Sequence, residues 1–231
     1  MKVGILARRA TFARAVTFFD AIFAFAVTLL ITTVDNFEPA TWSSLDALMD
    51  VEGTALLVFA ISFVVVVSFW RANHQQVTAF LALDNQLIML NCLVMFGVVL
   101  VPWTTEAMGK LSEYPLPVAL YAINISAVYV LQHVVGFVAE RKGVRGRAKL
   151  TGSQLRWELV DAVALPIVFL GSIPIAYLVS ASAAQRSWLL LLIIMPIIGN
   201  VQSKLAKSAA AQLDDPGHDH KQRGSGVEPT T

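Results

Sequence analysis

Six long runs of apolar residues constrain the fold of this chain more than any other feature of its sequence. Five contain no acidic residue, lysine or arginine, at residues 53–70, 85–105, 114–139, 162–185 and 187–203, and the sixth, at 15–34, contains only Asp20. A helix needs roughly 20 apolar residues to cross a hydrocarbon core of about 30 Å, whereas membrane-barrel strands alternate over segments of about 10 residues. The sequence therefore predicts an all-α, polytopic membrane protein with six transmembrane helices, at about residues 12–34, 53–74, 84–105, 114–139, 159–182 and 187–205.

The composition is typical of a chain that lies almost entirely within a bilayer. Of its 231 residues, 56% are hydrophobic and 14% are charged, while a soluble domain has roughly 25% charged residues. The net charge of +1 gives no indication of a nucleic-acid partner. No catalytic grouping stands out, so we expect neither an enzyme nor a bound cofactor. We predict one transmembrane domain over residues 1–207 and a disordered cytoplasmic tail over residues 208–231, which lack apolar periodicity.

The basic residues predict the orientation of the helices. If the N-terminus is cytoplasmic and the chain crosses six times, 15 of the 17 lysines and arginines lie on the cytoplasmic side, and only Lys110 and Arg186 lie outside. Such a bias is what the positive-inside rule requires. Acidic residues gather instead in the predicted outer connections, beginning with Asp35 and Glu38. Both termini are therefore predicted to be cytoplasmic.

One edge of the first predicted helix carries side chains suited to a cation path. With 3.6 residues per turn, Ala21, Phe25, Thr28, Thr32 and Asp35 form a narrow stripe. Threonine hydroxyls can replace part of the hydration shell of a cation, and a bulky apolar ring can narrow or dewet a channel. One helix cannot enclose a pore, so this interpretation requires a homo-oligomer. The alternative is that the threonines bond carbonyls of their own helix and the ring packs against a neighbour.

Asp20 lies inside the same helix and points elsewhere. An ionisable residue at the centre of a membrane helix costs roughly 2.5–3.5 kcal/mol on insertion scales, so it usually faces protein or water. Asp20 lies roughly 100° around the helix from the stripe, and candidate donors for it are Trp70, His74 and Asn91. Two hypotheses follow, an interhelical hydrogen-bond anchor and an ion or proton site.

The order and spacing of these residues resemble the lysosomal potassium channel family, which comprises transmembrane protein 175 and its bacterial relatives. The first-helix signature of that family is Arg, three variable residues, Phe-Ser-Asp, an apolar stretch and Thr-Leu. Residues 14–29 of this chain are RAVTFFDAIFAFAVTL. Trp70 and His74, then Asn91 and Pro102, follow in the same order, so that the resemblance covers roughly the first 105 residues.

The resemblance implies a potassium-selective leak channel, with K⁺ as the permeant ion and no cofactor. It further implies a homotetramer of single six-helix chains in a bacterial plasma membrane, with the first helices lining the pore. The pore residues we expect are Ala21, Phe25, Thr28, Leu29 and Thr32, of which the resemblance implies Phe25, Thr28 and Thr32. The support network that it implies for the pore helix is Arg14, Asp20, Trp70, His74 and Asn91. From their place in the first outer connection, we expect Asp35 and Glu38 to form an outer acidic mouth.

The chain departs from the family pattern in two ways, and two other functions fit the same residues. Phe19 replaces the signature Ser, while Phe25 and Thr32 replace aliphatic pore residues. The first alternative function is a proton-coupled or proton-conducting carrier that uses Asp20 and His74 as a relay. The second is a membrane interaction protein that transports nothing, in which Asp20 is purely structural.

Overall fold

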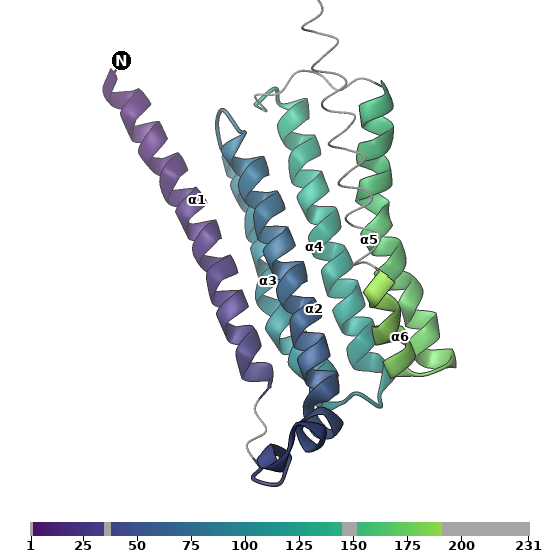
Figure 1. Cartoon of the computed structure of the whole chain (residues 1–231). Helices are drawn as coiled ribbons and strands as arrows, with labels where there is room; N and C mark the ends of the chain where they lie inside the picture. The colour runs from purple at the N-terminus through teal and green to yellow at the C-terminus, as the bar shows by residue number, and fades with distance from the viewer. Residues whose placement is uncertain (1, 35–37, 145–151, 191–231) are drawn as a thin grey trace, which may run out of the picture.

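The computed structural model describes residues 2–34, 38–144 and 152–190 of the chain, and side chains only from residue 12 of the first segment and residue 162 of the last (Figure 1). These residues form six α-helices and three short 3-10 helices, and no β-strand lies among them. The prediction of an all-α fold is confirmed over this part of the chain. The α-helices are α1 (Lys2–Leu30), α2 (Leu45–Thr78), α3 (Asn85–Lys110), α4 (Pro115–Arg141), α5 (Gly152–Leu178) and α6 (Ala181–Ser187). The 3-10 helices are η1 (Ile31–Thr33), η2 (Thr41–Ser43) and η3 (Trp188–Leu190).

Among the residues that the structure describes, four helical segments are long and apolar enough to cross a membrane. They are Phe12–Thr33, α2, α3 and α4, whereas the apolar part of α5, Ala162–Leu178, is shorter. The predicted sixth span at 187–205 lies mostly outside the described residues, as does the predicted tail at 208–231. Instead of continuing to residue 182, the fifth helix ends at Leu178, because Ser180 begins α6 by accepting a hydrogen bond from the backbone N–H of Ala183 at 3.1 Å.

The long helices run side by side in one bundle (Figure 1). α1 packs against α2 and α3, α3 packs against α4, and α4 packs against α5. In Figure 1, the N-terminal part of α1 leans away from its neighbours. α1 is therefore the helix at one side of the protomer, with one edge in the bundle and the other turned outward.

α3 and α4 approach closely at Gly97. A methyl group at this position would collide with the side chain of Val128 on α4. The amide of Asn124, also on α4, donates to the backbone oxygen of Gly97 at 3.0 Å. Small residues that let backbones approach, with a polar side chain across the contact, are typical of helix packing in membranes.

The loops at one end of the bundle are held together around Asp84. This carboxylate caps α3 by accepting from the backbone N–H of Leu87 at 2.9 Å, and it pairs with Lys142 at the end of α4. The backbone N–H of Leu81 donates to the oxygen of Val144 at 2.7 Å. The hydrogen bond from Lys142 holds the pKa of Asp84 below its usual value. The loop between α2 and α3 is thereby joined to the end of α4.

Candidate functional site

The predicted stripe of α1 is exposed on the protomer, while the opposite edge of the helix is buried. Phe25 is 70% exposed and Leu29 is 49% exposed, and Ala21, Thr28 and Thr32 are exposed as well. The buried edge comprises Phe19, Phe23, Ala26, Leu30 and Thr33. α1 is therefore two-sided, although it is apolar almost all round.

The exposed threonines donate their protons to their own helix. The hydroxyl of Thr28 donates to the backbone oxygen of Phe25 at 2.9 Å, and that of Thr32 donates to the oxygen of Leu29 at 2.7 Å. A hydroxyl has one proton and two lone pairs. With its proton used inside the helix, each oxygen can offer a lone pair to a cation beside the exposed edge. Self-bonding and cation coordination are thus compatible at these positions.

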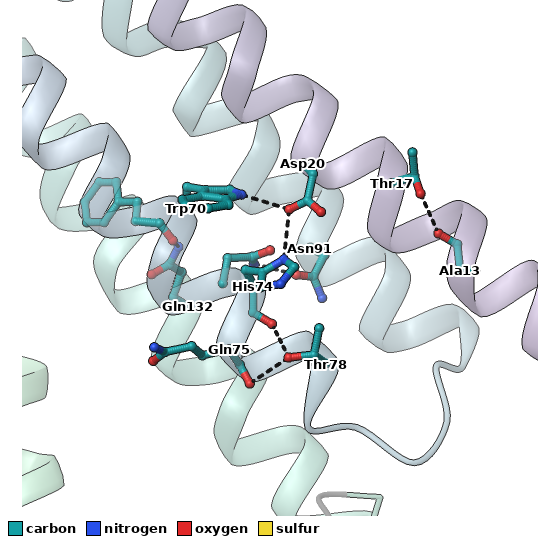
Figure 2. A network of polar contacts seen from close by, with 11 residues as sticks. Ala13, Thr17, Asp20, Trp70, His74, Gln75, Thr78, Asn91 and Gln132 are labelled. Atoms are coloured by element: carbon teal, nitrogen blue, oxygen red, sulfur yellow. Dashed lines mark hydrogen bonds and ion pairs between the residues drawn. The ribbon is translucent and has the colours of Figure 1, made fainter.

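Asp20 is turned towards α2 (Figure 2). Its Oδ1 accepts a hydrogen bond from the indole Nε1 of Trp70 at 2.9 Å and lies 3.2 Å from Nδ1 of His74. The rings of Trp70 and His74 lie 5.6 Å apart on consecutive turns of α2. The carboxylate therefore joins α1 to α2 through two side chains, and both are among the donors expected from the sequence. The side chains of Asp20 and His74 are 35% and 42% exposed in the protomer.

Asn91 and Arg14 occupy other surroundings. Asn91 is fully buried on α3, where its oxygen accepts from the amide of Asn73 at 2.9 Å and its own amide donates to the backbone oxygen of Leu87 at 2.8 Å. Arg14 is exposed on α1. The structure thus brings Asp20 together with two of the four other network candidates. Asn73 was missed by the sequence reasoning, because it is one of three amides near the end of α2, with Gln75 and Gln76, and nothing in the sequence distinguishes it from the other two.

The predicted acidic mouth is only partly described. Glu38 is exposed in the connection between η1 and η2, and Asp35 lies outside the described residues. Lys110 and Glu106 form an ion pair at 2.8 Å near the end of α3.

A second polar cluster joins α2, α3 and α4, and nothing in the sequence indicated it. The hydroxyl oxygens of Ser62 and Tyr121 lie 3.0 Å apart, and those of Ser62 and Thr105 lie 2.9 Å apart. Thr105 also donates to the backbone oxygen of Val101 at 2.8 Å. The ring of Tyr121 stacks on Trp188 of η3 at 5.1 Å. This hydroxyl cluster therefore connects the helices beside α1 with the far side of the bundle.

The comparison with known families matches the part of the chain that carries this geometry. A sequence model described as endosomal/lysosomal potassium channel TMEM175 matches residues 14–102, which comprise most of α1, all of α2 and most of α3. The resemblance to the TMEM175 family is confirmed. Members of this family are channels and not enzymes. The matched segment contains every candidate pore and network residue, while α4, α5 and α6 follow it.

Three relatives that match this chain are named for two different ions, potassium and the proton. A potassium channel of Streptomyces collinus is 34% identical over 106 residues, which are 44% of this chain and 48% of the relative. The endosomal/lysosomal proton channel TMEM175 of Mus musculus is 24% identical over 123 residues, or 53% of this chain and 25% of the relative. A potassium channel of a Chryseobacterium species is 24% identical over 126 residues, which are 53% of this chain and 64% of the relative. The chain thus spans less than two thirds of each relative, and no solved structure matches it.

Proposed function

We propose that this chain is a potassium-selective, leak-type cation channel that conducts K⁺ down its gradient. Four copies surround one pore, which the exposed edge of α1 lines. The chain crosses a bacterial plasma membrane six times, with both termini in the cytoplasm, as the distribution of basic residues requires. The names of the Streptomyces and Chryseobacterium relatives support potassium as the permeant ion.

The observation that carries the proposal is the exposure of a mixed edge on α1. The edge presents two hydroxyl oxygens, one turn apart, whose lone pairs remain available to a cation because their protons are bound inside the helix. The opposite edge is buried against α2 and α3. In a symmetric ring of four, the exposed edges face the axis and give each layer four equivalent side chains.

The layers have distinct roles in this proposal. Four Phe25 rings form an apolar constriction, which controls whether water and ions fill the narrowest part. The hydroxyl oxygens of Thr28 and Thr32 replace lost waters of the cation, and oxygen spacing in the Thr28 layer favours K⁺ over Na⁺. Asp20, through Trp70 and His74, positions α1 against α2 and does not contact the ion.

The decisive experiment is a flux assay on purified protein in liposomes. Under a K⁺ gradient the wild-type protein carries K⁺ flux, and its absence refutes the channel. Thr28→Val reduces discrimination between K⁺ and Na⁺. The matched control is Thr33→Val, because Thr33 makes the same type of bond, to the oxygen of Leu30 at 2.7 Å, on the buried edge. If Thr28→Val and Thr33→Val show equal ratios of K⁺ to Na⁺ flux, Thr28 does not determine selectivity.

Proton conduction is the second candidate function. It is favoured by the direct contact between Asp20 and His74, two groups that can exchange a proton, and by the name of the mammalian relative. In liposomes with a pH gradient and no K⁺ gradient, a proton path through this pair would acidify the lumen, and Asp20→Asn would abolish that flux. K⁺ flux that persists without lumenal acidification favours the potassium channel. A protein that carries neither ion supports the interaction protein.

A further inference from the structure

Thr17 extends the exposed edge of α1 beyond the residues singled out from the sequence. It lies one turn before Ala21 and two turns before Phe25, at four-residue steps, so that it is offset by only about 40° from Ala21 around the helix. Its side chain is exposed on the protomer. Along the axis, Thr17 lies roughly 12 Å from Phe25 at 1.5 Å per residue, on the side opposite Thr28.

The hydroxyl of Thr17 bonds to a backbone oxygen of its own helix, as those of Thr28 and Thr32 do. It donates to the backbone oxygen of Ala13 at 3.0 Å, which leaves the oxygen's lone pairs available beside the helix. Figure 2 shows this bond along α1, with the Asp20 carboxylate of the next turn directed to Trp70 and His74 instead. Thr17 therefore provides a neutral oxygen on the exposed edge, whereas the carboxylate of Asp20 is directed to α2.

We propose that four Thr17 hydroxyls form a second cation-binding layer, on the inner side of the Phe25 constriction. This inference rests on the proposed channel. A monovalent cation that enters from the N-terminal end of α1 meets oxygen ligands at Thr17, crosses the apolar segment of Ala21 and Phe25, and meets oxygen ligands again at Thr28. Two hydroxyl layers on either side of an apolar segment lower the cost of dehydration at both entrances.

Arg14, one turn further out, does not occupy the Thr17 layer. Side chains on an α-helix tilt towards its N-terminus, and a long arginine near the start of a membrane span, here Phe12–Thr33, extends its charge into the membrane interface. The guanidinium is therefore directed away from Thr17 along the axis. The layer selects cations by hydroxyl coordination, and Arg14 marks the outer limit of the binding layer.

The test uses patch recordings of the full chain, in which the orientation is fixed and currents in both directions are measured. Thr17→Val lowers the K⁺ current that enters from the N-terminal end of α1 several-fold at low K⁺, while the K⁺/Na⁺ reversal potential stays at the wild-type value. Thr17→Ser keeps the hydroxyl and the wild-type current. Valine matches threonine in shape and branching, and size-exclusion elution at the wild-type volume verifies assembly.

Three outcomes overturn one proposal or the other. Wild-type currents in both directions for Thr17→Val remove the inner layer and leave the channel intact. A reversal potential in Thr17→Val that shifts as in Thr28→Val also contradicts an entry layer, because it places selectivity at Thr17. A wild-type chain that carries no K⁺ current refutes the channel itself, independently of any Thr17 variant.

Discussion

Replacing Ser62 with alanine tests whether the three buried hydroxyls between α2, α3 and α4 share their protons in one direction. The hydroxyl of Thr105 donates both to the backbone oxygen of Val101 at 2.8 Å and to the oxygen of Ser62 at 2.9 Å. The hydroxyl of Ser62 donates in turn to the oxygen of Tyr121 at 3.0 Å. The protons of the cluster therefore point from Thr105 towards Tyr121, and of the three hydroxyls Ser62 both donates and accepts within the cluster.

The direction of the hydrogen bonds determines how much folding stability each substitution removes. Ser62 and Tyr121 are fully buried and Thr105 is 1% exposed, so water cannot replace a lost partner. Tyr121→Phe strands the proton of Ser62, and a buried donor left without an acceptor costs about 1–3 kcal/mol. Ser62→Ala removes that donor and leaves the oxygen of Tyr121 under-used, while Thr105 keeps Val101 as an acceptor, so this substitution costs about 1 kcal/mol. In the Ser62→Ala background, Tyr121→Phe no longer strands a donor, so its cost falls to about 1 kcal/mol or less.

The assay is a double-mutant cycle on purified protein in detergent. Unfolding is followed by tryptophan fluorescence, to which Trp188, stacked on Tyr121, contributes directly. Protein concentration is held constant, because assembly makes the midpoint concentration-dependent. The matched control is Ser68→Ala, since Ser68 is an exposed serine on α2 whose hydroxyl donates to its own helix at 2.7 Å. A Ser62→Ala variant that loses more stability than Tyr121→Phe would show that the protons point the other way.

Three further predictions follow from the contacts around α1, α3 and the loops. Asp20→Ala lowers the yield of folded, assembled protein in size-exclusion chromatography, because it strands the indole N–H of Trp70. Asp20→Asn keeps an oxygen acceptor and therefore most of the yield. Full assembly of the alanine variant with altered permeation would place Asp20 in the ion path. Because Lys142 lowers the pKa of Asp84, the stability from their pair is present above the unfolded-state pKa and is lost as the pH falls through the folded-state value. Acid melting curves should show this loss in the wild type, and Asp84→Asn should remove it. Gly97→Ala forces α3 away from α4 and lowers the melting temperature by the equivalent of about 1–3 kcal/mol, and an unchanged temperature would mean that the helices separate freely.

The helices and the contact at Asp20 could be predicted because their signals are local or chemically rare. Long apolar runs predict spans. An acidic residue within a span needs donors, and few polar side chains were available to provide them, so Trp70 and His74 were expected. The partner of Asn91 was not predicted. Several amides near the ends of α2 and α3 are candidates for this contact, and only the helix register selects Asn73.

The hydroxyl cluster shows where sequence reasoning stops. The contact between Ser62 and Thr105 joins residues that are 43 positions apart in the sequence, and the contact between Ser62 and Tyr121 joins residues that are 59 positions apart. Each lies in a run that reads as ordinary membrane helix, since serine, threonine and tyrosine occur there without marking a partner. Only the packing of three helices brings the oxygens within 3.0 Å.

The sequence by itself determined that this chain is helical and membrane-spanning, because the length and continuity of its apolar runs leave no other way to satisfy the backbone in lipid. It also determined the stripe on α1, because a helix converts spacing into direction. The tertiary structure decided which edge of α1 is buried. A helix that is apolar on all sides carries little information about which face meets its neighbours, so that choice depends on the shapes of α2 and α3, against which α1 packs.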